Sequence, residues 1–358
     1  TFFFEYKNFF FLLLFFFISL LINLVFSNDI YLSYQRVTKF FFVIFFIISF
    51  KYLIVNSSKN LEIIYKFWSI FFLIVIVDLL IEFFVGKNVL GQSSIMPGRL
   101  GSFTGQESVI GHFFFGFCLI FLSFLYTRFK KDSFTLILAS SLIIISFLIG
   151  ERANLIRTFF AISLFIFFIN KIDFKFKILS IILIIFSGYL IIQFNTDQSY
   201  KLRYGPMKSI FTPNGLTKYL DKSEYGAHRN TAKEIFLDNP LFGVGIKNFR
   251  VESRKEKYND SEKHMLGSNH PHELYYEFLS ETGIFGIICF LTFILSSIFL
   301  SLKNYLLKKN IYQLCGMITV IVSILPVLPT GSFLATFPSS IFWINYAIMM
   351  GYNYNNKN

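Results

Sequence analysis

Charged residues are scarce in this 358-residue chain, where Asp, Glu, Lys and Arg together make up 15% of the sequence. A typical soluble globular domain carries about 25% charged residues. Hydrophobic residues instead make up 54% of the chain, and its mean hydropathy is +0.60. This composition excludes an ordinary soluble globule and indicates a polytopic membrane protein.

Cysteine is also rare, and the three cysteines, Cys118, Cys289 and Cys315, all lie within apolar runs. Their number is odd and their spacing is not that of metal ligands, which argues against a disulfide framework and against a zinc site. We therefore expect no bound metal and interpret the cysteines as small core residues.

A single basic patch is missing as well, although the formal net charge is +12. The basic residues occur in short clusters between apolar runs, which argues against nucleic acid as a partner. The sequence after the first apolar run, Ser27-Asn-Asp-Ile30, offers no small-x-small cleavage site. We expect this first run to remain in the protein as a membrane anchor.

Ten apolar runs are long enough to cross a bilayer, which takes about 20 residues as a helix. They fall at residues 9–26, 38–55, 67–85, 109–126, 133–149, 153–170, 176–194, 283–302, 311–328 and 332–352. The predicted fold class is therefore all-α integral membrane: a polytopic helical bundle of about ten transmembrane helices.

Positive charge predicts the orientation, because Lys and Arg gather in cytoplasmic loops. The regions around and after even-numbered runs carry twelve basic residues: Lys51, Lys59, Lys66, Arg128, Lys130, Lys131, Lys171, Lys175, Lys177, Lys303, Lys308 and Lys309. The linkers after odd-numbered runs carry five: Arg36, Lys39, Lys87, Arg99 and Arg152. This asymmetry predicts cytoplasmic termini and puts residues 86–108, 150–152 and 195–272 on the opposite side.

Residues 195–272 form the one long polar segment, and they contain four of the five histidines. We predict three parts along the chain: transmembrane helices 1–7 in residues 1–194, an outer loop with short helices in residues 195–272, and helices 8–10 in residues 273–358. Within the loop, residues 229–238 are predicted to form a short helix that ends at Asn239-Pro240. Residues 197–225 show no strand alternation and are expected to be irregular.

Two acidic residues one turn apart, Asp78 and Glu82, lie inside the third apolar run. A structural pairing with a basic residue on another helix would explain them. Charges deep in the spans together with repeated halves would instead indicate a transporter or flippase. No internal repeat is visible, and the other charges of interest lie near the outer ends of the runs, so the transporter class is kept only as the alternative.

Three arginines on the non-cytoplasmic side are candidates for phosphate binding, because a guanidinium is a permanently charged fork. Arg152 opens an apolar run directly after Gly150-Glu151, although snorkelling or pairing with Glu151 would also explain it. Arg229 begins the short loop helix, where a solvated surface charge is the alternative. Arg99 lies in a glycine-rich outer loop that lacks the strand–loop–helix context of a phosphate-binding loop.

Two histidines, His270 and His272, lie where the long polar segment meets the next hydrophobic stretch. A zinc protease motif would need a second histidine where Tyr276 stands, so that class is excluded. A histidine at the water boundary can act as a general base, because its ordinary pKa is about 6.5. A plain loop histidine is the alternative.

An acidic stripe follows, because Glu273, Glu277 and Glu281 are spaced four residues apart and share one face of a helix. Gly283 and Gly286 come next and are predicted to offer a smooth face to a neighbouring helix. Polar groups at the boundary between water and lipid are costly, so the stripe is a functional candidate.

Together these segments resemble the O-antigen ligase and polymerase family of bacterial membrane glycosyltransferases. The strongest likeness is His272-Glu273, then nine residues, then Gly283-Ile-Phe-Gly286. Glu273 stands where the family has Asn, Ser or Gln, a departure that bears on the ligase subtype. Three further segments, residues 99–105, 150–153 and 229–249, follow in the order that the family has.

The resemblance implies transfer of a glycan from an undecaprenyl-diphosphate-linked donor to an acceptor sugar at the periplasmic face of the bacterial inner membrane, with no metal and no other cofactor. It also implies that residues 195–272, between the seventh and eighth helices, are a periplasmic loop. By position, Arg152 and Arg229 would bind and neutralise the donor diphosphate, and His272 would activate the acceptor hydroxyl.

The resemblance implies supporting roles for four other residues. Glu277 and Glu281 would orient the histidine or hold the arginines, and Arg99 and His270 are expected to contact the substrate.

The acceptor distinguishes two readings of this resemblance. A ligase would use the lipid A core, whereas a polymerase would use a second lipid-linked repeat unit. Both share the donor chemistry and the lipid bilayer as surroundings, and neither involves nucleic acid. A purely structural assembly partner, as a further class, would tolerate His272→Ala.

Overall fold

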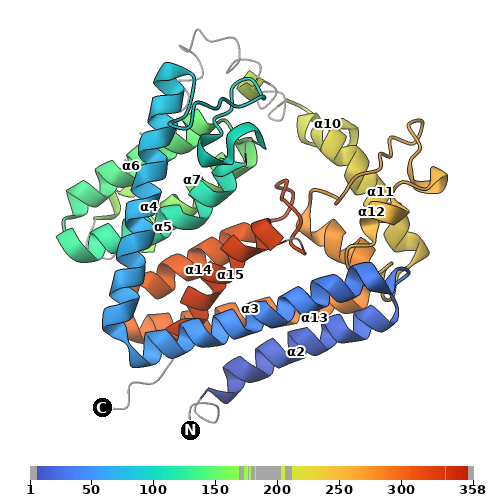
Figure 1. Cartoon of the computed structure of the whole chain (residues 1–358), viewed down its shortest axis with the longest axis horizontal. Coiled ribbons are helices and arrows are strands. Elements are labelled where there is room, and N and C mark those ends of the chain that lie inside the picture. Colours follow the sequence, from blue (N-terminus) through green and yellow to red (C-terminus); the bar gives the residue numbers. More distant parts are fainter. Residues whose placement is uncertain are drawn as a thin grey trace. The chain divides into compact units, whose positions relative to one another are not determined.

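The computed structural model describes residues 6–107, 109–168, 173–175, 177–178, 182, 203–205, 212–334 and 336–353, and all regular elements among them are helices (Figure 1). They are α2 (Lys7–Val25), α3 (Ile30–Asn56), α4 (Ser58–Val85), η1 (Ser102–Glu107), α5 (Ile110–Phe129), α6 (Asp132–Ile149), α7 (Arg152–Phe168), α10 (Gly215–Lys222), α11 (Glu224–Asp238), α12 (Phe249–Glu252), η2 (Glu256–Tyr258), α13 (Leu274–Lys308), α14 (Ile311–Ser323) and α15 (Thr336–Gly351). The helical fold class predicted from the composition is confirmed.

Six of these helices are long and apolar enough to cross a membrane: α2, α3, α4, α5, α6 and α13. A seventh, α14, is apolar but shorter. The expected run at 176–194 lies outside the described residues apart from three positions, so the count of ten spans stays a prediction, as does the position of the long loop.

Three membrane helices begin at least eight residues before the predicted apolar runs: α3 at Ile30, α4 at Ser58 and α13 at Leu274. The reason is that an apolar window finds only the part of a helix in the hydrocarbon core. A helix of 27 residues is about 40 Å long, which also spans the headgroup layers where polar side chains are solvated. Arg36 and Lys39, expected in a linker, therefore lie within α3.

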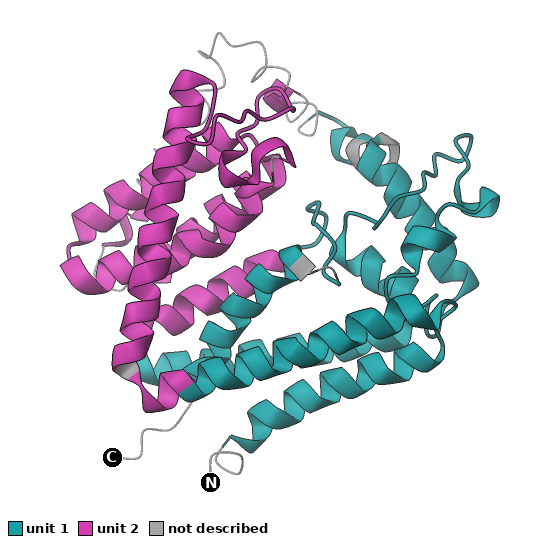
Figure 2. Cartoon of the chain, viewed as in Figure 1, with its two compact units in different colours: residues 1–52, 210–308, 324–358 teal, residues 53–209, 309–323 magenta. Residues whose placement is uncertain are grey.

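The chain divides into two compact units, drawn in Figure 2. Unit 1 contains residues 1–52, 210–308 and 324–358, and unit 2 contains residues 53–209 and 309–323. Each is described by itself below.

Unit 1 is built around α13, which packs against α2, α11, α12 and α15. Phenylalanine rings fill its core: Phe16 of α2 stacks on Phe293 of α13 with centroids 4.8 Å apart, and Phe278 stacks on Phe290 at 4.3 Å. Ring pairs of this kind add to the stabilisation from buried area alone.

A kink at Gly283 breaks the regularity of α13, with a left-handed φ of +64°. Residues 240–245 fit into this kink, where the amides of Ile284 and Phe285 donate to the carbonyls of Pro240 (2.8 Å) and Leu241 (3.1 Å). A Cβ on Gly283 would come within 2.4 Å of Leu241 backbone atoms. The prediction that Gly283 faces a neighbouring helix is therefore wrong: the glycine admits a loop.

The polar segment before α13 is more ordered than expected in the part that the structure describes. α10 covers Gly215–Lys222 and α11 begins at Glu224, so the expectation of irregular structure over 197–225 is wrong for these residues. The predicted end of the loop helix is confirmed, because α11 stops at Asp238 and is capped by Asn239.

Unit 2 is centred on α5, which packs against α4, α6, α7 and α14 and is largely buried. Its Cys118, like Cys289 and Cys315 elsewhere, is a free and buried thiol, as expected for core residues.

Asp78 and Glu82 of α4 fold the following loop back onto their own helix. Glu82 accepts from the amides of Gly101 (3.0 Å) and Ser102 (2.7 Å), and Asp78 accepts from the Ser102 hydroxyl (2.6 Å) and the Val89 amide (2.7 Å). Their role is structural as expected, but these partners are loop donors and not the basic residue that we predicted. Hydrogen bonds from backbone amides can stabilise a buried carboxylate, as a neighbouring cation also can.

Candidate active site

A small cavity of about 20 Å³ in unit 1 brings together two of the predicted site residues, Arg229 and His272. It lies between the start of α11, the residues before α13 and the segment after α14. Its walls are Ser223, Tyr225, Gly226, Arg229, His272, Glu273, Val327 and Pro329. We call it the histidine cavity.

The first turns of α11 position the arginine. The Ser223 hydroxyl accepts from the Gly226 amide (3.0 Å) and so caps the helix. Tyr225 and Arg229 are four residues apart and therefore share the face that lines the cavity. The Arg229 guanidinium lies 5.8 Å from the centre of the Tyr276 ring and is attracted by the Glu273 carboxylate, so its charge is held in place at the cavity wall.

His272 has an unusual backbone conformation, with a φ of +58°. Its carbonyl accepts from the Thr330 amide (2.8 Å), which ties the histidine to the segment after α14. A left-handed residue other than glycine costs of order 1–3 kcal/mol and is a marker of functional sites when the surroundings hold it.

Three aromatic rings surround the His272 imidazole. The ring centres of His270, His228 and Tyr225 lie 3.9, 5.3 and 5.4 Å from that of His272. His228 is buried and its Nδ1 is 3.1 Å from the Leu266 carbonyl oxygen. No group of three or more potential ligands is arranged to hold a metal ion within the described part of the chain.

This environment keeps the imidazoles neutral. Burial, and after it the neighbouring His228, lower the pKa of His272 to about 4. Burial and the charge of His272 lower the pKa of His270 to about 3. A neutral imidazole can accept a proton, so His272 is in the state that a general base requires throughout the physiological pH range.

Glu273 acts as the cap of α13. Its carboxylate accepts from the Tyr276 amide (3.0 Å), and burial raises its pKa while the Tyr276 and Tyr275 amides lower it. Asn and Ser are the residues that usually cap helices in this way. The physical requirement at this position is a side-chain acceptor, which Glu273 supplies.

Glu277 and Glu281 are fully buried and hold loops onto α13. Glu277 accepts from the Ser332 hydroxyl and the Phe333 amide (2.8 Å), and Glu281 accepts from the Lys247 amide (2.7 Å). The hydrogen bonds of both carboxylates thus go to loop residues, whereas we expected them at the histidine or the arginines. Nothing in the four-residue spacing could have revealed these partners, because both loops are distant in sequence.

The remaining predicted arginines belong to unit 2, around the turn between α6 and α7. The loop with Arg99 packs on this turn: the Leu100 amide donates to the Ile149 carbonyl (3.0 Å), and a Cβ on Gly150 would lie 1.9 Å from the Gly98 oxygen. Arg152 opens α7.

A buried carboxylate, Glu151, lies within this turn. It accepts from the Gly111 amide (2.6 Å) and the Asn154 side chain (2.6 Å), and it attracts Arg99 and Arg203. Burial raises the pKa of Glu151. We call Arg99, Glu151, Arg152 and Arg203 the arginine turn.

Two residues of these sites, Tyr225 and Arg203, were not predicted from the sequence. Tyr225 lies four residues before Arg229, a helical spacing that could have placed it on the cavity wall. Arg203, whose Nε donates to the Gly150 carbonyl (2.7 Å), follows a long stretch with no pattern that would have linked it to Glu151.

In a comparison with protein families, residues 135–291 match a family described as O-antigen ligase. The matched stretch includes Arg152, Arg229, His270 and His272, whereas Arg99 lies before it. A comparison with curated proteins gives no match.

Proposed function

We propose that this chain, whose residues 135–291 match the O-antigen ligase family, transfers a glycan from an undecaprenyl-diphosphate-linked donor to a hydroxyl of an acceptor glycolipid. The proposed place of the reaction is the periplasmic face of the bacterial inner membrane. The proposed acceptor is the sugar of a lipid A core. The helical membrane architecture agrees with a lipid-borne substrate.

The observation that carries the proposal is the histidine cavity. Arg229 and His272 come from segments 43 residues apart and line one cavity. A permanently charged guanidinium and a neutral imidazole are the two groups needed to break a sugar–diphosphate bond in favour of an incoming hydroxyl.

In the proposed reaction His272 removes the proton of the acceptor hydroxyl. The hydroxyl oxygen forms a bond to the anomeric carbon of the donor sugar, and the bond from that carbon to the diphosphate oxygen breaks. The proton stays on His272, which becomes an imidazolium, and the electron pair of the broken bond goes to the diphosphate oxygen. Arg229 stabilises the charge that develops on this leaving group.

We further propose that Arg152, and with it Arg99, bind the donor diphosphate. Support comes from the matched family stretch for Arg152, and from the chemistry of the arginine turn, where the guanidiniums of Arg99 and Arg203 interact with a single carboxylate, Glu151. Arginine forms paired hydrogen bonds to phosphate oxygens, which suits this role.

The test is glycan transfer from a purified lipid-linked donor by His272→Asn and Arg229→Lys. Asparagine tolerates a left-handed φ, so His272→Asn removes the base without adding backbone strain. We expect it to lose about 10²- to 10⁴-fold in kcat. Arg229→Lys keeps the charge but loses the fork, and we expect about a tenfold or larger loss.

Lys233→Ala is the matched control, because Lys233 is an exposed cation on the same helix as Arg229. It should transfer glycan at the normal rate. Normal transfer by a folded His272→Asn protein would contradict the proposal. Supplying lipid A core in one assay and a lipid-linked repeat unit in another identifies the acceptor, and activity with the repeat unit alone would replace the ligase with a polymerase.

A further inference from the structure

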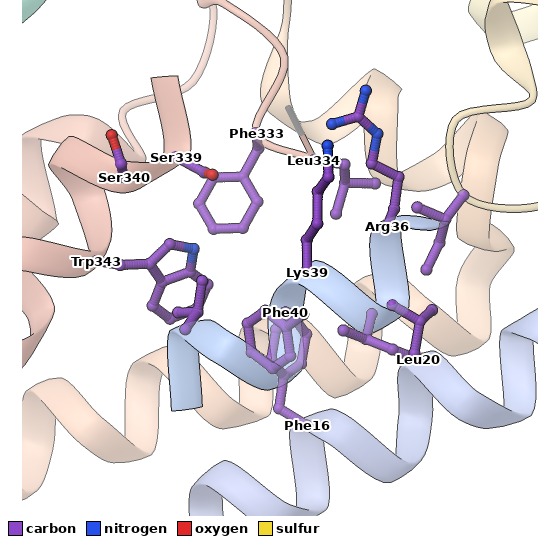
Figure 3. Close-up of a pocket in the computed structure, with 13 residues that line it drawn as sticks. Phe16, Leu20, Arg36, Lys39, Phe40, Phe333, Leu334, Ser339, Ser340 and Trp343 are labelled. Atoms are coloured by element: carbon purple, nitrogen blue, oxygen red, sulfur yellow. The ribbon is translucent and has the colours of Figure 1, made fainter. Parts of the chain in front are cut away.

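A second cavity of unit 1, with a volume of about 120 Å³, lies between α2, α3 and α15 and the loop residues Ile246, Phe333 and Leu334. Figure 3 shows aromatic rings, those of Phe40 and Trp343 among them, along one side. The charged ends of Arg36 and Lys39 point together to the other side. The space is narrow and half open, so it fits one chain of a molecule and not a whole ligand, and its makeup is that of a binding site, mostly apolar with a few converging polar groups.

Positive charge is concentrated at that end. Arg36 is repelled by Arg250 and attracted by Glu281. Lys247, buried nearby with its amine 3.2 Å from the Ser332 hydroxyl, is attracted by Glu281 and Glu277 and repelled by Arg250 and Arg36. Four cations, Arg36, Lys39, Lys247 and Arg250, thus outnumber the two carboxylates at the edge of this apolar space, and the excess positive charge favours an anion there.

The cavity opens toward the surroundings of the helices. Lys39 and Ser340 line it and are exposed, and next to Lys39 on α3 the rings of Phe41 and Phe42 are 44% and 66% exposed. Exposed phenylalanines on a membrane-spanning helix contact lipid chains. A molecule from the bilayer can therefore enter sideways.

We propose that this cavity binds an anionic phospholipid of the bilayer, with its phosphate between Arg36 and Lys39 and an acyl chain along Phe40, Phe333 and Trp343. Charge complementarity fixes the headgroup, and the apolar lining fixes the chain. A bilayer phospholipid is favoured over other phosphate-bearing lipids because it surrounds these helices in large excess, and occupancy follows concentration.

The bound lipid would support the histidine cavity. Phe333 lines the lipid cavity, and its amide is held by Glu277. Three residues earlier, the amide of Thr330 donates to the His272 carbonyl. A lipid chain against Phe333 therefore stabilises the short segment that fixes the left-handed backbone of His272.

The experiment uses Trp343 as a reporter, because the chain has only two tryptophans and Trp68→Phe leaves Trp343 alone. The full-length variant is placed in phosphatidylcholine vesicles with increasing fractions of brominated phosphatidylglycerol or brominated phosphatidylcholine, which quench tryptophan fluorescence on contact. We expect half-maximal quenching at about 30-fold less of the anionic lipid, since each lysine or arginine near an anionic headgroup contributes about fivefold in affinity.

Arg36→Gln with Lys39→Gln should abolish this preference, and the exposed Lys39→Gln alone should reduce it about fivefold in a protein that keeps its fold. Lys303→Gln, an exposed cation on α13 of the same unit, should leave it unchanged. Equal quenching by both lipids, or a preference that survives the double substitution, overturns the proposal. So does displacement of the brominated lipid by geranylgeranyl diphosphate but not by unbrominated phosphatidylglycerol, because the cavity would then bind a substrate.

Discussion

The histidine cavity of unit 1 and the arginine turn of unit 2 both gather basic side chains, but they treat charge in opposite ways. In the cavity, burial and neighbouring imidazoles keep His272 neutral, with a pKa of about 4. In the turn, two guanidiniums that cannot lose their charge, those of Arg99 and Arg203, interact with one carboxylate, Glu151. Neutral bases and fixed cations serve different chemical tasks, proton transfer and anion binding.

The buried carboxylates of the two units also have different tasks. Glu281 is held by backbone amides of a distant loop, so its main task is to fix that loop. Glu151 also accepts from an amide, that of Gly111, but it faces Arg99 and Arg203. The comparison teaches that a buried acid can anchor backbone in one region and limit the repulsion between arginines in another.

The largest expected effect separates the two regions by kinetics. If the arginine turn binds the donor, Arg152→Ala should raise KM for the lipid-linked donor and lower kcat/KM by about 10²- to 10³-fold, the loss seen when a phosphate or oxyanion partner is removed. His272→Asn should lower kcat with little change in donor KM. The measurement is steady-state transfer over a range of donor concentrations. An Arg152→Ala protein with an unchanged donor KM would show that the turn plays no part in donor binding.

A second comparison replaces the anchoring acid of each unit by glutamine. Glu281→Gln leaves a buried amide without its partner and should lower the free energy of unfolding by about 3 kcal/mol. Glu151→Gln should change the free energy of unfolding by less than about 1 kcal/mol, because the raised pKa of Glu151 shows that the cost of burying its charge exceeds the attraction to the arginines. Added salt or phosphate should stabilise this variant, because screening and anion binding relieve the repulsion between the arginines. Thermal unfolding in detergent, with and without phosphate, gives both values. If phosphate also stabilised the Glu281→Gln variant, the two carboxylates would not differ in role.

The pH response should also differ in sign. The pKa values of His270 and His272, about 3 and 4, lie below the ordinary value near 6.5, so the unfolded chain binds more protons. The stability that they contribute is complete above about pH 6.5 and falls as the pH drops toward about 4. The raised pKa of Glu151 means that acid instead favours the folded state there.

Hydrogen exchange, corrected for the intrinsic effect of pH, can test this. Peptides around His272 should lose protection as the pH falls from about 6.5 to about 4, and peptides around Glu151 should not. Equal loss in both regions would mean that the histidines are not the cause.

The smallest expected effect concerns His228, whose charge is the second cause of the low pKa of His272. His228→Gln should raise the pKa of His272 and move the acid limb of the transfer rate upward by about half a pH unit, a roughly threefold lower rate at acid pH. The pH–rate profile is the measurement, and the neutral-pH rate is its internal control. An unmoved acid limb would leave burial as the sole cause.

Particular residues show how far the sequence could lead. The apolar runs predicted helices because a bilayer demands about 20 apolar residues whatever the tertiary structure. The end of α11 at Asp238 followed from Asn239-Pro240, since proline cannot continue a helix. The start of α3 was missed by eight residues, because hydropathy does not register the polar turns that lie in the headgroup region.

The site was less predictable than the fold. His272 and Arg229 could be singled out one at a time, from a motif and a helix start, and the sharing of one cavity emerged only from the structure. Glu277 and Glu281 were expected beside the site, but their carboxylates went to amides at Phe333 and Lys247, which no local spacing encodes. Gly283 was expected to face a helix and instead receives a loop, because its φ of +64° bends α13 away from a regular surface.

The sequence by itself determined that this is a helical membrane protein with a polar segment rich in histidine, because composition and run length act locally and need no knowledge of distant partners. Only the tertiary structure decided which ionisable groups are neutral, which charges are buried near others of the same sign, and which line a cavity. Those properties depend on burial and on side chains brought from far along the chain, and burial sets the pKa and the cost of every charged group that it encloses.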